Sequence, residues 1–332
     1  MPASAPEGRY YERLEGGSVR CGLCPHRCVL KDGAVGLCRV RVNHGGRLEL
    51  PFFGAVSAEA IDPIEKKPLY HFKPGSRVYS VGYLGCNLRC PFCQNYGISQ
   101  TTLAPSVAYT PAGLARAAKA SGCPSLAHTY SEPLVHAEFV IETMVEARAA
   151  GLANVLVTNG CALADAASDV LDHCDAANVD LKSWDPAWYR SELGGDLDAV
   201  KAFIAMAIGK GVHVEVTTLV IPGKTDKPED IVAMSKFLAG LSPDIPYHLS
   251  AYRPVYKYTI PPTPDATVQK LASLAREQLR YVYEGNIFNE SNDTRCPYCG
   301  AILVRRHGYA VDASGLKHGA CAACGTPAPF VA

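Results

Sequence analysis

Between residues 76 and 285, short apolar runs alternate with segments in which apolar residues recur every three or four positions. The apolar runs are typical of buried strands, and the periodic segments are typical of helices that bury one face. The runs predict strands at 77–82, 125–130, 154–160, 176–182, 212–223, 247–252 and 280–285. The periodic segments predict helices at 110–120, 133–151, 163–174, 197–211, 227–241 and 263–279, the first of them capped by Thr110.

Repeated strand–helix units with continuous apolar strands indicate an α/β fold, with parallel strands and with helices packed outside them. The number of units predicts a partial (β/α)6 barrel, similar to part of a TIM barrel, over residues 76–285. A doubly wound open sheet is the alternative architecture. It is disfavoured because no glycine-rich dinucleotide fingerprint follows the first strand.

Two flanking regions break this pattern. Residues 1–75 are rich in glycine, cysteine and basic residues and show little helical period. Residues 286–332 carry two cysteine pairs in a short, turn-rich segment. The expected organisation is an N-terminal four-cysteine metal-binding module with a lead-in loop (1–75), the barrel (76–285) and a C-terminal module similar to a zinc ribbon (286–332).

The overall charge excludes some classes of protein. Lys plus Arg and Asp plus Glu both total 32, so nothing draws the chain to nucleic acid or to an anionic membrane. No apolar run reaches the length of a membrane span, and the first residues lack the apolar core of a secretory signal. We therefore expect a cytoplasmic protein.

Fourteen cysteines are many for such a chain, and metal binding or redox chemistry is favoured over disulfides in a reducing compartment. Three groups contain eleven of them: Cys21, Cys24, Cys28 and Cys38; Cys86, Cys90 and Cys93; Cys296, Cys299, Cys321 and Cys324. The scattered Cys123, Cys161 and Cys174 are expected to be small buried hydrophobic residues.

The central group brings three closely spaced thiolates and no fourth. Three cysteines can hold three irons of a four-iron cluster and leave the fourth iron open to another ligand. A zinc site or an ordinary cluster with a distant fourth ligand is the alternative. The group follows the first barrel strand, at the face where such barrels carry their chemistry. Polar residues end later strands on this face: Glu132, Thr158, Asn159, Asp180, Lys182, Thr217, Thr218 and His248.

The stretch "CNLRCPFC" resembles the motif of the radical S-adenosylmethionine (SAM) superfamily. The resemblance implies that Cys86, Cys90 and Cys93 hold a [4Fe-4S] cluster whose open iron binds SAM. One electron then cleaves SAM to methionine and a 5′-deoxyadenosyl radical, which abstracts hydrogen from a substrate. The electron donor is expected to be a flavodoxin or a ferredoxin. These cysteines are the expected catalytic residues.

The barrel also resembles the branch of glycyl-radical-enzyme activases that includes pyruvate formate-lyase activating enzyme. Its Gly-Gly-Glu-Pro stretch corresponds to Tyr130-Ser131-Glu132-Pro133 here, which implies that Glu132 binds the SAM amino group. Thr217 or Thr218 stands where that branch has an arginine for the SAM carboxylate. The resemblance implies further SAM contacts from Thr158, Asn159, Asp180, Lys182 and His248, and a monovalent cation near Thr158 and Asp180.

A resemblance over nearly the whole chain is to the radical SAM component of the AmmeMemoRadiSam system. It rests on "CPHRC", "GLCRVRVN", "IDPIEKKPLYHFKPGS", "HTYSEP", "VTNG", "NVDLK" and "NDTRCPYCG". The resemblance implies Memo-type and AMMECR-type proteins as partners and leaves the substrate open.

The two flanking cysteine groups predict closed metal sites. Cys296, Cys299, Cys321 and Cys324 form two Cys-x-x-Cys knuckles, which predict a structural Zn2+ site, with rubredoxin-like iron or a redox role as the alternative. Cys21, Cys24, Cys28 and Cys38 have irregular spacing, and both Zn2+ and an auxiliary iron–sulfur cluster fit them.

The leading hypothesis is a radical SAM enzyme acting on an unidentified small molecule or protein. An activase of glycyl-radical enzymes is the first alternative, and the two added cysteine modules argue against it. A zinc-dependent nucleic-acid-binding or scaffold protein is the second, and the balanced charge argues against it. The third is an electron carrier without SAM chemistry. The charged segment 61–72 is either a solvated loop or a segment over the cavity that helps to hold substrate or SAM.

Overall fold

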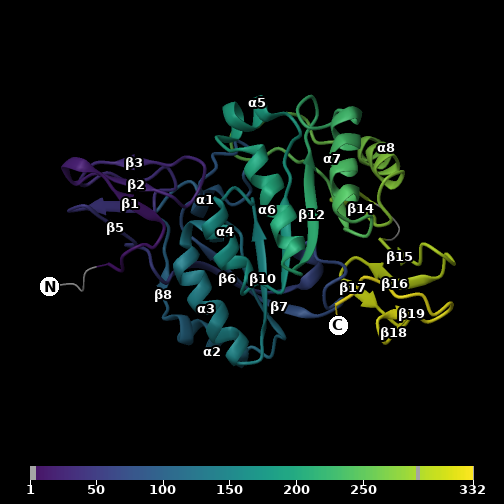
Figure 1. Ribbon diagram of the computed structural model, residues 1–332. Coiled ribbons are helices and arrows are strands. Elements are labelled where there is room, and N and C mark those ends of the chain that lie inside the picture. The colour runs from purple at the N-terminus through teal and green to yellow at the C-terminus, as the bar shows by residue number, and fades with distance from the viewer. Residues whose placement is uncertain (1–4, 289–291, 332) are drawn as a thin grey trace.

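The computed structural model describes residues 5–288 and 292–331, and its centre is a nine-stranded sheet (Figure 1). Seven neighbouring strands of this sheet run parallel and follow one another in chain order. They are β7 (Arg77–Tyr83), β9 (Ser125–Thr129), β10 (Ala153–Thr158), β11 (Ala176–Asp180), β12 (His213–Val220), β13 (Tyr247–Ala251) and β14 (Val282–Gly285). The predicted parallel α/β fold is confirmed.

Long helices connect these strands and lie in front of the sheet in Figure 1. They are α2 (Pro111–Ala120), α3 (Ala137–Ala149), α4 (Ala164–Leu171), α6 (Leu197–Gly209), α7 (Pro228–Leu241) and α8 (Asp265–Arg276). Shorter helical turns are η1 (Glu15–Gly17), η2 (Ile64–Lys66), α1 (Tyr96–Ser99), η3 (Pro133–His136), α5 (Pro186–Trp188) and η4 (Tyr189–Leu193). The sheet stays open because β14 and β8 (Val107–Ala108) are its two edges. No helix of the described residues is both long enough and apolar enough to cross a bilayer.

The lead-in region contains a strand that the hydrophobic pattern did not predict. β6 (Ala55–Pro63) pairs antiparallel with β7 and carries β8 on its other side. Its sequence, AVSAEAIDP, is rich in alanine and acidic residues, which have low strand propensity. The strand conformation of β6 therefore results from its pairing with the buried strand β7.

The segment after β6 fills part of the inner face of the sheet, the face turned away from the helices. Ile64, Leu69 and Phe72 pack there against Val78 of β7 and Val155 of β10. The solvated-loop alternative for 61–72 is wrong, because four of its charged or polar residues are enclosed, although Lys66 is exposed. The exposed fractions are 4% for Asp62, 5% for Glu65, 2% for Lys67 and 0% for His71.

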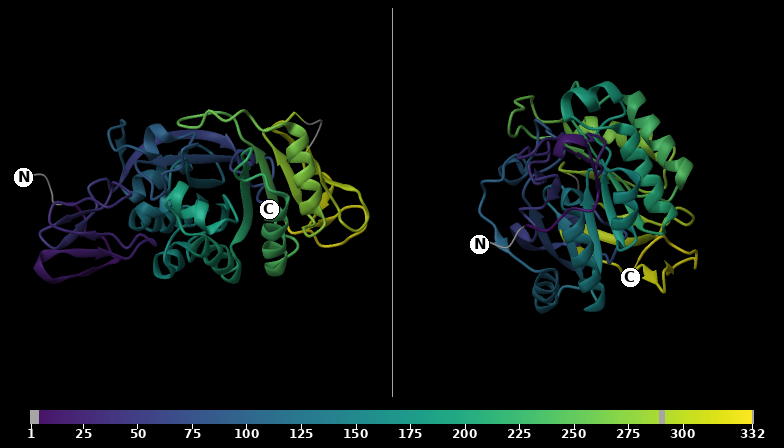
Figure 2. Two further views of the ribbon diagram at one scale, coloured as in Figure 1. Left: turned by 90° about the horizontal axis from the view of Figure 1, so that it is seen from above. Right: turned by 60° about the vertical axis from the view of Figure 1, so that its left-hand side comes forward.

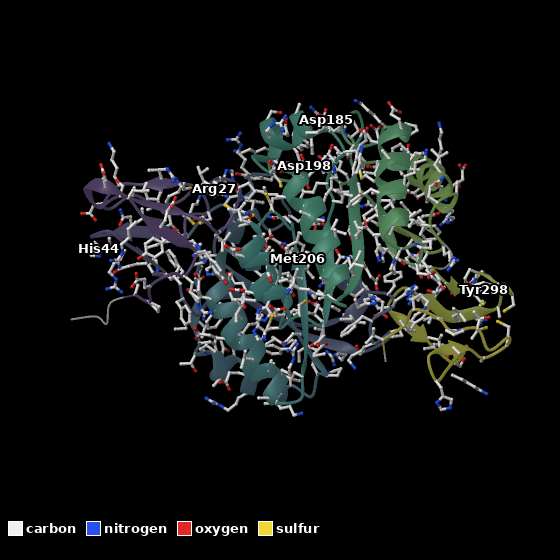
Figure 3. The ribbon with its side chains drawn as sticks, viewed as in Figure 1. Arg27, His44, Asp185, Asp198, Met206 and Tyr298 are labelled. Atoms are coloured by element: carbon white, nitrogen blue, oxygen red, sulfur yellow. The ribbon has the colours of Figure 1, made fainter. Side chains whose placement is uncertain are left out.

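Two small modules lie at opposite ends of the sheet (Figure 2). The N-terminal module has the strands β1 (Tyr11–Arg13), β2 (Val19–Cys21), β3 (Val29–Leu30), β4 (Val42–His44) and β5 (Arg47–Glu49). The C-terminal module has the strands β15 (Thr294–Arg295), β16 (Ile302–His307), β17 (Ala310–Asp312), β18 (Leu316–Lys317) and β19 (Ala320–Cys321). His44 and Tyr298, labelled in Figure 3, mark the two modules.

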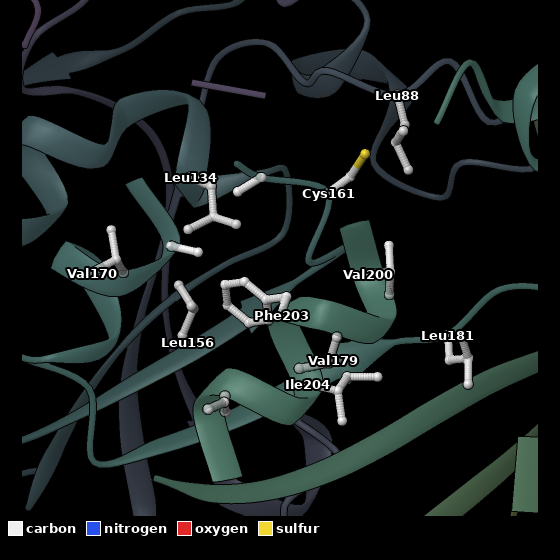
Figure 4. Close-up of a cluster of buried hydrophobic side chains, with 14 of the residues drawn as sticks. Leu88, Leu134, Leu156, Cys161, Val170, Val179, Leu181, Val200, Phe203 and Ile204 are labelled. Carbon is white, nitrogen blue, oxygen red and sulfur yellow. The ribbon is translucent and has the colours of Figure 1, made fainter. Parts of the chain in front are cut away.

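Apolar packing between the helices and the sheet forms the main core (Figure 4). Phe203 of α6 is 1% exposed and lies beside Val179 of β11 and Leu156 of β10. Burying one such side chain contributes about 2–3 kcal/mol, so many of them together hold the helices in place. Cys123, Cys161 and Cys174 are also buried, as their isolated positions predict.

Candidate active site at the carboxyl end of the parallel strands

The loop that carries Cys86, Cys90 and Cys93 begins directly after β7. Gly85 starts it with a φ of +79°, a conformation that favours glycine. A Cβ at this position would lie 2.4 Å from the carbonyl oxygen of Cys38, so only glycine lets the two backbones touch. The N-terminal module therefore packs against the residue that precedes Cys86.

Polar groups contact two of the sulfur atoms of this loop. The backbone N–H of Leu88 donates to the Cys86 Sγ at 3.3 Å, and the Ser99 hydroxyl lies 3.2 Å from the Cys93 Sγ. Burial raises the pKa of Cys86 well above its usual range and that of Cys90 to about 12. Burial alone therefore favours neutral thiols, whereas a bound metal ion would hold them as thiolates.

Asn87 connects the cysteine loop to the end of β10, a role that sequence reasoning missed. Its Oδ1 accepts a hydrogen bond from Asn159 Nδ2 at 2.9 Å, and its Nδ2 donates to the Cys161 carbonyl at 2.7 Å. Asn159 Nδ2 also lies 3.7 Å from the Cys86 Sγ. Asn159, one of the expected SAM contacts, is thus placed beside the first cysteine.

The Glu132 carboxylate lies between the ends of β9 and β10. Its Oε1 accepts hydrogen bonds from the Thr158 hydroxyl at 2.6 Å and the Leu134 N–H at 3.0 Å, and its Oε2 accepts one from the Asn159 N–H at 2.7 Å. Burial raises its pKa to about 7, although these three donors oppose the rise. Glu132, Thr158 and Asn159 therefore form one hydrogen-bonded group.

Asp180 and Lys182 form an ion pair at the end of β11, with 2.8 Å between Nζ and Oδ2. Burial lowers the pKa of Lys182, but the charges of Asp180 and Cys90 more than compensate, and the net result is a raised pKa. The ammonium group thus lies close enough to Cys90 to favour its thiolate. The structure brings this expected pair to the cysteine loop.

His248 lies on the inner face of the sheet, in register with Thr217 of β12 and, one strand further, with Asp180. Its Nε2 is 2.7 Å from Glu215 Oε2, and its ring meets the Tyr70 ring edge-on, 4.8 Å between centroids. It is 3% exposed. Its neighbours are therefore residues of the inner face, whereas the other expected SAM contacts are linked to the cysteine loop.

A second group on the inner face was not assigned from sequence. Tyr130 follows β9 with a φ of +68°, and its hydroxyl donates to Asp62 Oδ2 at 2.5 Å. Lys67 Nζ lies 2.6 Å from the same carboxylate oxygen and 4.3 Å from the Tyr130 ring centroid. Asn95, in the cysteine loop, donates to the Tyr130 carbonyl at 2.6 Å. This group connects segment 61–72 to the candidate active site.

The sulfur atoms of the C-terminal module form one close group. Cys296 and Cys324 have their Sγ atoms 3.7 Å apart, as do Cys299 and Cys321. Four sulfurs at about 2.3 Å from one zinc ion would be about 3.8 Å apart. Across residues 5–288 and 292–331, this is the one group whose potential metal ligands all lie within 4.8 Å of one another. The C-terminal four-cysteine cluster expected from sequence is confirmed.

Comparisons with known proteins agree with this architecture. Residues 80–237 match the family model described as the radical SAM superfamily. The fold is similar to Streptococcus suis SuiB bound to S-adenosylmethionine, with a TM-score of 0.50, 16% identity and coverage of 63% of this chain. The match spans 50% of the SuiB chain. A structure of TYW1 with a lysine-pyruvate adduct bound also gives a TM-score of 0.50 and 16% identity, over 71% of this chain and 88% of that one.

One curated relative is similar over most of its length. The uncharacterised protein MJ0808 of Methanocaldococcus jannaschii is 39% identical over 307 residues, which cover 91% of each chain.

Proposed function

We propose that this chain, which belongs to the same family as MJ0808 and matches the radical SAM superfamily over residues 80–237, is an enzyme that cleaves SAM reductively. When bound, a reduced [4Fe-4S] cluster supplies one electron to SAM, which yields methionine and a 5′-deoxyadenosyl radical that abstracts hydrogen from a substrate. Cys86, Cys90 and Cys93 would hold this cluster. The substrate is a small molecule or a residue of a partner protein.

The observation that carries the proposal is the three-cysteine loop at the carboxyl end of β7. Three closely spaced cysteines can each bind one iron of a four-iron cluster and leave the fourth iron open to another ligand. The Leu88 N–H that donates to the Cys86 sulfur and the Ser99 hydroxyl beside the Cys93 sulfur suit thiolate ligands of a cluster.

The surrounding residues have distinct proposed roles in binding SAM. The Glu132 carboxylate attracts the positively charged amino group, and Thr158 and Asn159 fix its orientation through their hydrogen bonds. Lys182 and Asp180 extend the polar surface next to Cys90. His248 is proposed to act on the SAM site indirectly, from the inner face of the sheet, because its ring nitrogen is hydrogen-bonded to Glu215.

The C-terminal module is proposed to hold a structural Zn2+. Its sulfur spacing of 3.7 Å fits a tetrahedral four-thiolate site, which leaves no ligand position for a substrate. Several expectations stay predictions from sequence: the AmmeMemoRadiSam assignment, Memo-type and AMMECR-type partners, a flavodoxin or ferredoxin donor, and a cytoplasmic location.

The test is 5′-deoxyadenosine formation from SAM by anaerobically reconstituted, dithionite-reduced protein. Wild type should form the product, and Cys86→Ala should not. Cys123→Ala is the matched control, because Cys123 is a buried cysteine outside all three groups. Product from Cys86→Ala at the wild-type rate would contradict the proposal, and so would the absence of product from wild type.

A further inference from the structure

Tyr130 has a backbone conformation that residues with a side chain rarely adopt. It directly follows β9, two positions before Glu132, and its φ is +68°. This left-handed region suits glycine, whereas a Cβ makes it unfavourable. Contacts with the rest of the fold must therefore hold Tyr130 in this conformation.

The Tyr130 side chain is anchored on segment 61–72. Its hydroxyl donates to Asp62 Oδ2 at 2.5 Å, and Lys67 Nζ lies over its ring, 4.3 Å from the centroid. Lys67 Nζ is also 2.6 Å from the same carboxylate oxygen. Burial alone would raise the pKa of Asp62, but hydrogen bonds from Lys67, Tyr130 and Lys66 lower it well below its usual range. Asp62 is therefore an ionised, enclosed acceptor for the Tyr130 hydroxyl.

Small residues make room for the Tyr130 ring on the inner face of the sheet. Ala58 of β6 and Gly82 of β7 are register partners. A Cβ at Gly82 would lie 3.0 Å from the Tyr130 Cβ and Cδ2 and 3.3 Å from the Ala58 Cβ. Any side chain at position 82 would therefore crowd the ring.

The main chain at Tyr130 connects two loops of the candidate active site. The Tyr130 carbonyl accepts a hydrogen bond from Asn95 Nδ2 at 2.6 Å, and Asn95 lies two residues after Cys93. The hydroxyl of the next residue, Ser131, accepts one from the Tyr83 N–H at 3.3 Å. The conformation of Tyr130 thus sets how the loop after β9 meets the cysteine loop.

The donors around Glu132 fit an ammonium group as a further partner. A carboxylate has about four acceptor positions, and donors from Thr158, Leu134 and Asn159 take three of them. Glu132 Oε2 can accept one more donor. Burial is the main cause of the raised pKa of Cys86, and the charge of Glu132 is the next. The carboxylate therefore lies close to the cysteine loop, and its exact direction matters for a ligand held between the two.

We propose that Tyr130 is a positioning residue of the SAM site and that Asp62 and Lys67 hold it in place. The anchored side chain keeps the backbone left-handed, and this backbone directs the Glu132 carboxylate toward the cysteine loop. Segment 61–72 thus contributes to SAM binding through Tyr130. SAM as the ligand rests on the proposed function, whereas the anchor rests on the contacts of Tyr130 itself.

Substitutions at position 130 separate the backbone from the side chain. The SAM affinity of each anaerobically reconstituted variant is measured by equilibrium dialysis. Tyr130→Ala should weaken binding about 10- to 100-fold, as for residues that orient the ligands of a metal. Tyr130→Gly should bind SAM about fivefold more tightly than Tyr130→Ala, because glycine accepts the left-handed backbone. Tyr79→Ala is the matched control and should match wild type, since the Tyr79 hydroxyl donates to an exposed carboxylate, Glu59, at 2.8 Å.

A double-mutant cycle tests the anchor. Asp62→Asn/Lys67→Met removes it without leaving a buried charge unpaired. This variant should weaken SAM binding as much as Tyr130→Phe does, and the combination of both should cause no further loss. Losses that add would overturn the anchoring role of Asp62 and Lys67. Circular dichroism establishes that each variant is folded, and this cycle decides if Tyr130→Ala is not.

Amide hydrogen exchange follows the same loop without SAM. The Leu134 and Asn159 N–H groups, which donate to Glu132, should exchange faster in Tyr130→Ala than in wild type or Tyr79→Ala. Unchanged exchange would overturn the positioning role, and so would equal SAM affinities of Tyr130→Ala and Tyr130→Gly. Wild type that holds its cluster and binds no SAM would contradict the proposed function, and the exchange rates would still decide whether Tyr130 positions Glu132.

Discussion

The guanidinium carbon of Arg306 lies 4.4 Å from the ring centroid of Tyr70, although 235 residues separate the two positions. Arg306 Nη2 also donates to the Tyr70 carbonyl at 2.6 Å, and Nη1 donates to the Thr294 hydroxyl at 2.7 Å. The Tyr70 ring in turn contacts the His248 ring. The buried cation of Arg306 therefore links the C-terminal module to the inner face of the sheet.

Arg306→Met should lower the free energy of unfolding by about 2–3 kcal/mol, because the buried Tyr70 carbonyl and Thr294 hydroxyl lose a charged donor. The matched control is Arg305→Met, since Arg305 is the exposed neighbour on β16. It should change stability by less than about 0.5 kcal/mol. Denaturant unfolding of both variants measures the difference. Equal losses would show that the buried contacts do not stabilise the fold.

Cys296→Ala should remove one zinc ion per chain and loosen the C-terminal module, because binding energy at a four-thiolate site is folding energy. Protease should then cut within 292–331 faster than in wild type. Cys174→Ala, at a buried cysteine outside the site, should retain the zinc. Zinc content is measured by atomic emission. Unchanged zinc in Cys296→Ala would rule out the proposed ligand set.

Glu138→Gln should destabilise the protein by about 3–5 kcal/mol, because Arg41 would keep a buried charge without a counter-ion. The side chains of Arg41 and Glu138 are 1% and 3% exposed, and Arg41 Nη1 donates to Glu138 Oε1 at 3.0 Å. Glu142→Gln is the control one helical turn later, in an exposed pair that should contribute less than about 1 kcal/mol. Thermal unfolding compares the two. A similar small effect for both would show that Arg41 does not need the Glu138 charge.

His128 should make the fold less stable in mild acid. Burial lowers its pKa from 6.5 to about 3, so the folded state holds it neutral. The contribution of neutral His128 to the free energy of unfolding is fully present above pH 6.5. It is lost progressively as the pH falls from 6.5 toward 3. At pH 5.5 the loss amounts to about 1.4 kcal/mol. Between pH 6.5 and 5, unfolding of His128→Gln should take up as much as one proton less than unfolding of wild type. The unfolding free energy of the variant should therefore depend less steeply on pH. An unchanged slope would show that His128 already takes up its proton in the folded protein.

Much of the central fold is predictable from sequence because its signals are local. Alternating apolar runs and periodic segments locate the strands and helices of residues 76–285, and Thr110 caps α2 by accepting from the Gly113 N–H at 3.1 Å. The C-terminal cysteine cluster follows from two Cys-x-x-Cys turns. The three-cysteine motif likewise places a loop at the end of β7.

The remaining features depend on partners distant in sequence. Nothing local to Asp62 and Lys67 shows that they are enclosed, because Tyr130, which follows β9, completes their site. Asn87 sits next to Cys86, and that adjacency was a signal, but its partners Asn159 and Cys161 emerge only from the fold. The position of His248 depends on the pairing of β12 with β13, which turns it toward Glu215.

The closure of residues 329–331 over His71 has a consequence for biosynthesis. Phe330 stacks on the His71 ring at 4.1 Å, and the Val331 N–H donates to the His71 carbonyl at 2.9 Å. On the ribosome, segment 64–72 is made early but cannot complete these contacts until residue 331 has left the exit tunnel. The inner face should therefore mature only after residue 331 has emerged, and chains stalled before Arg306 should remain substrates for chaperones.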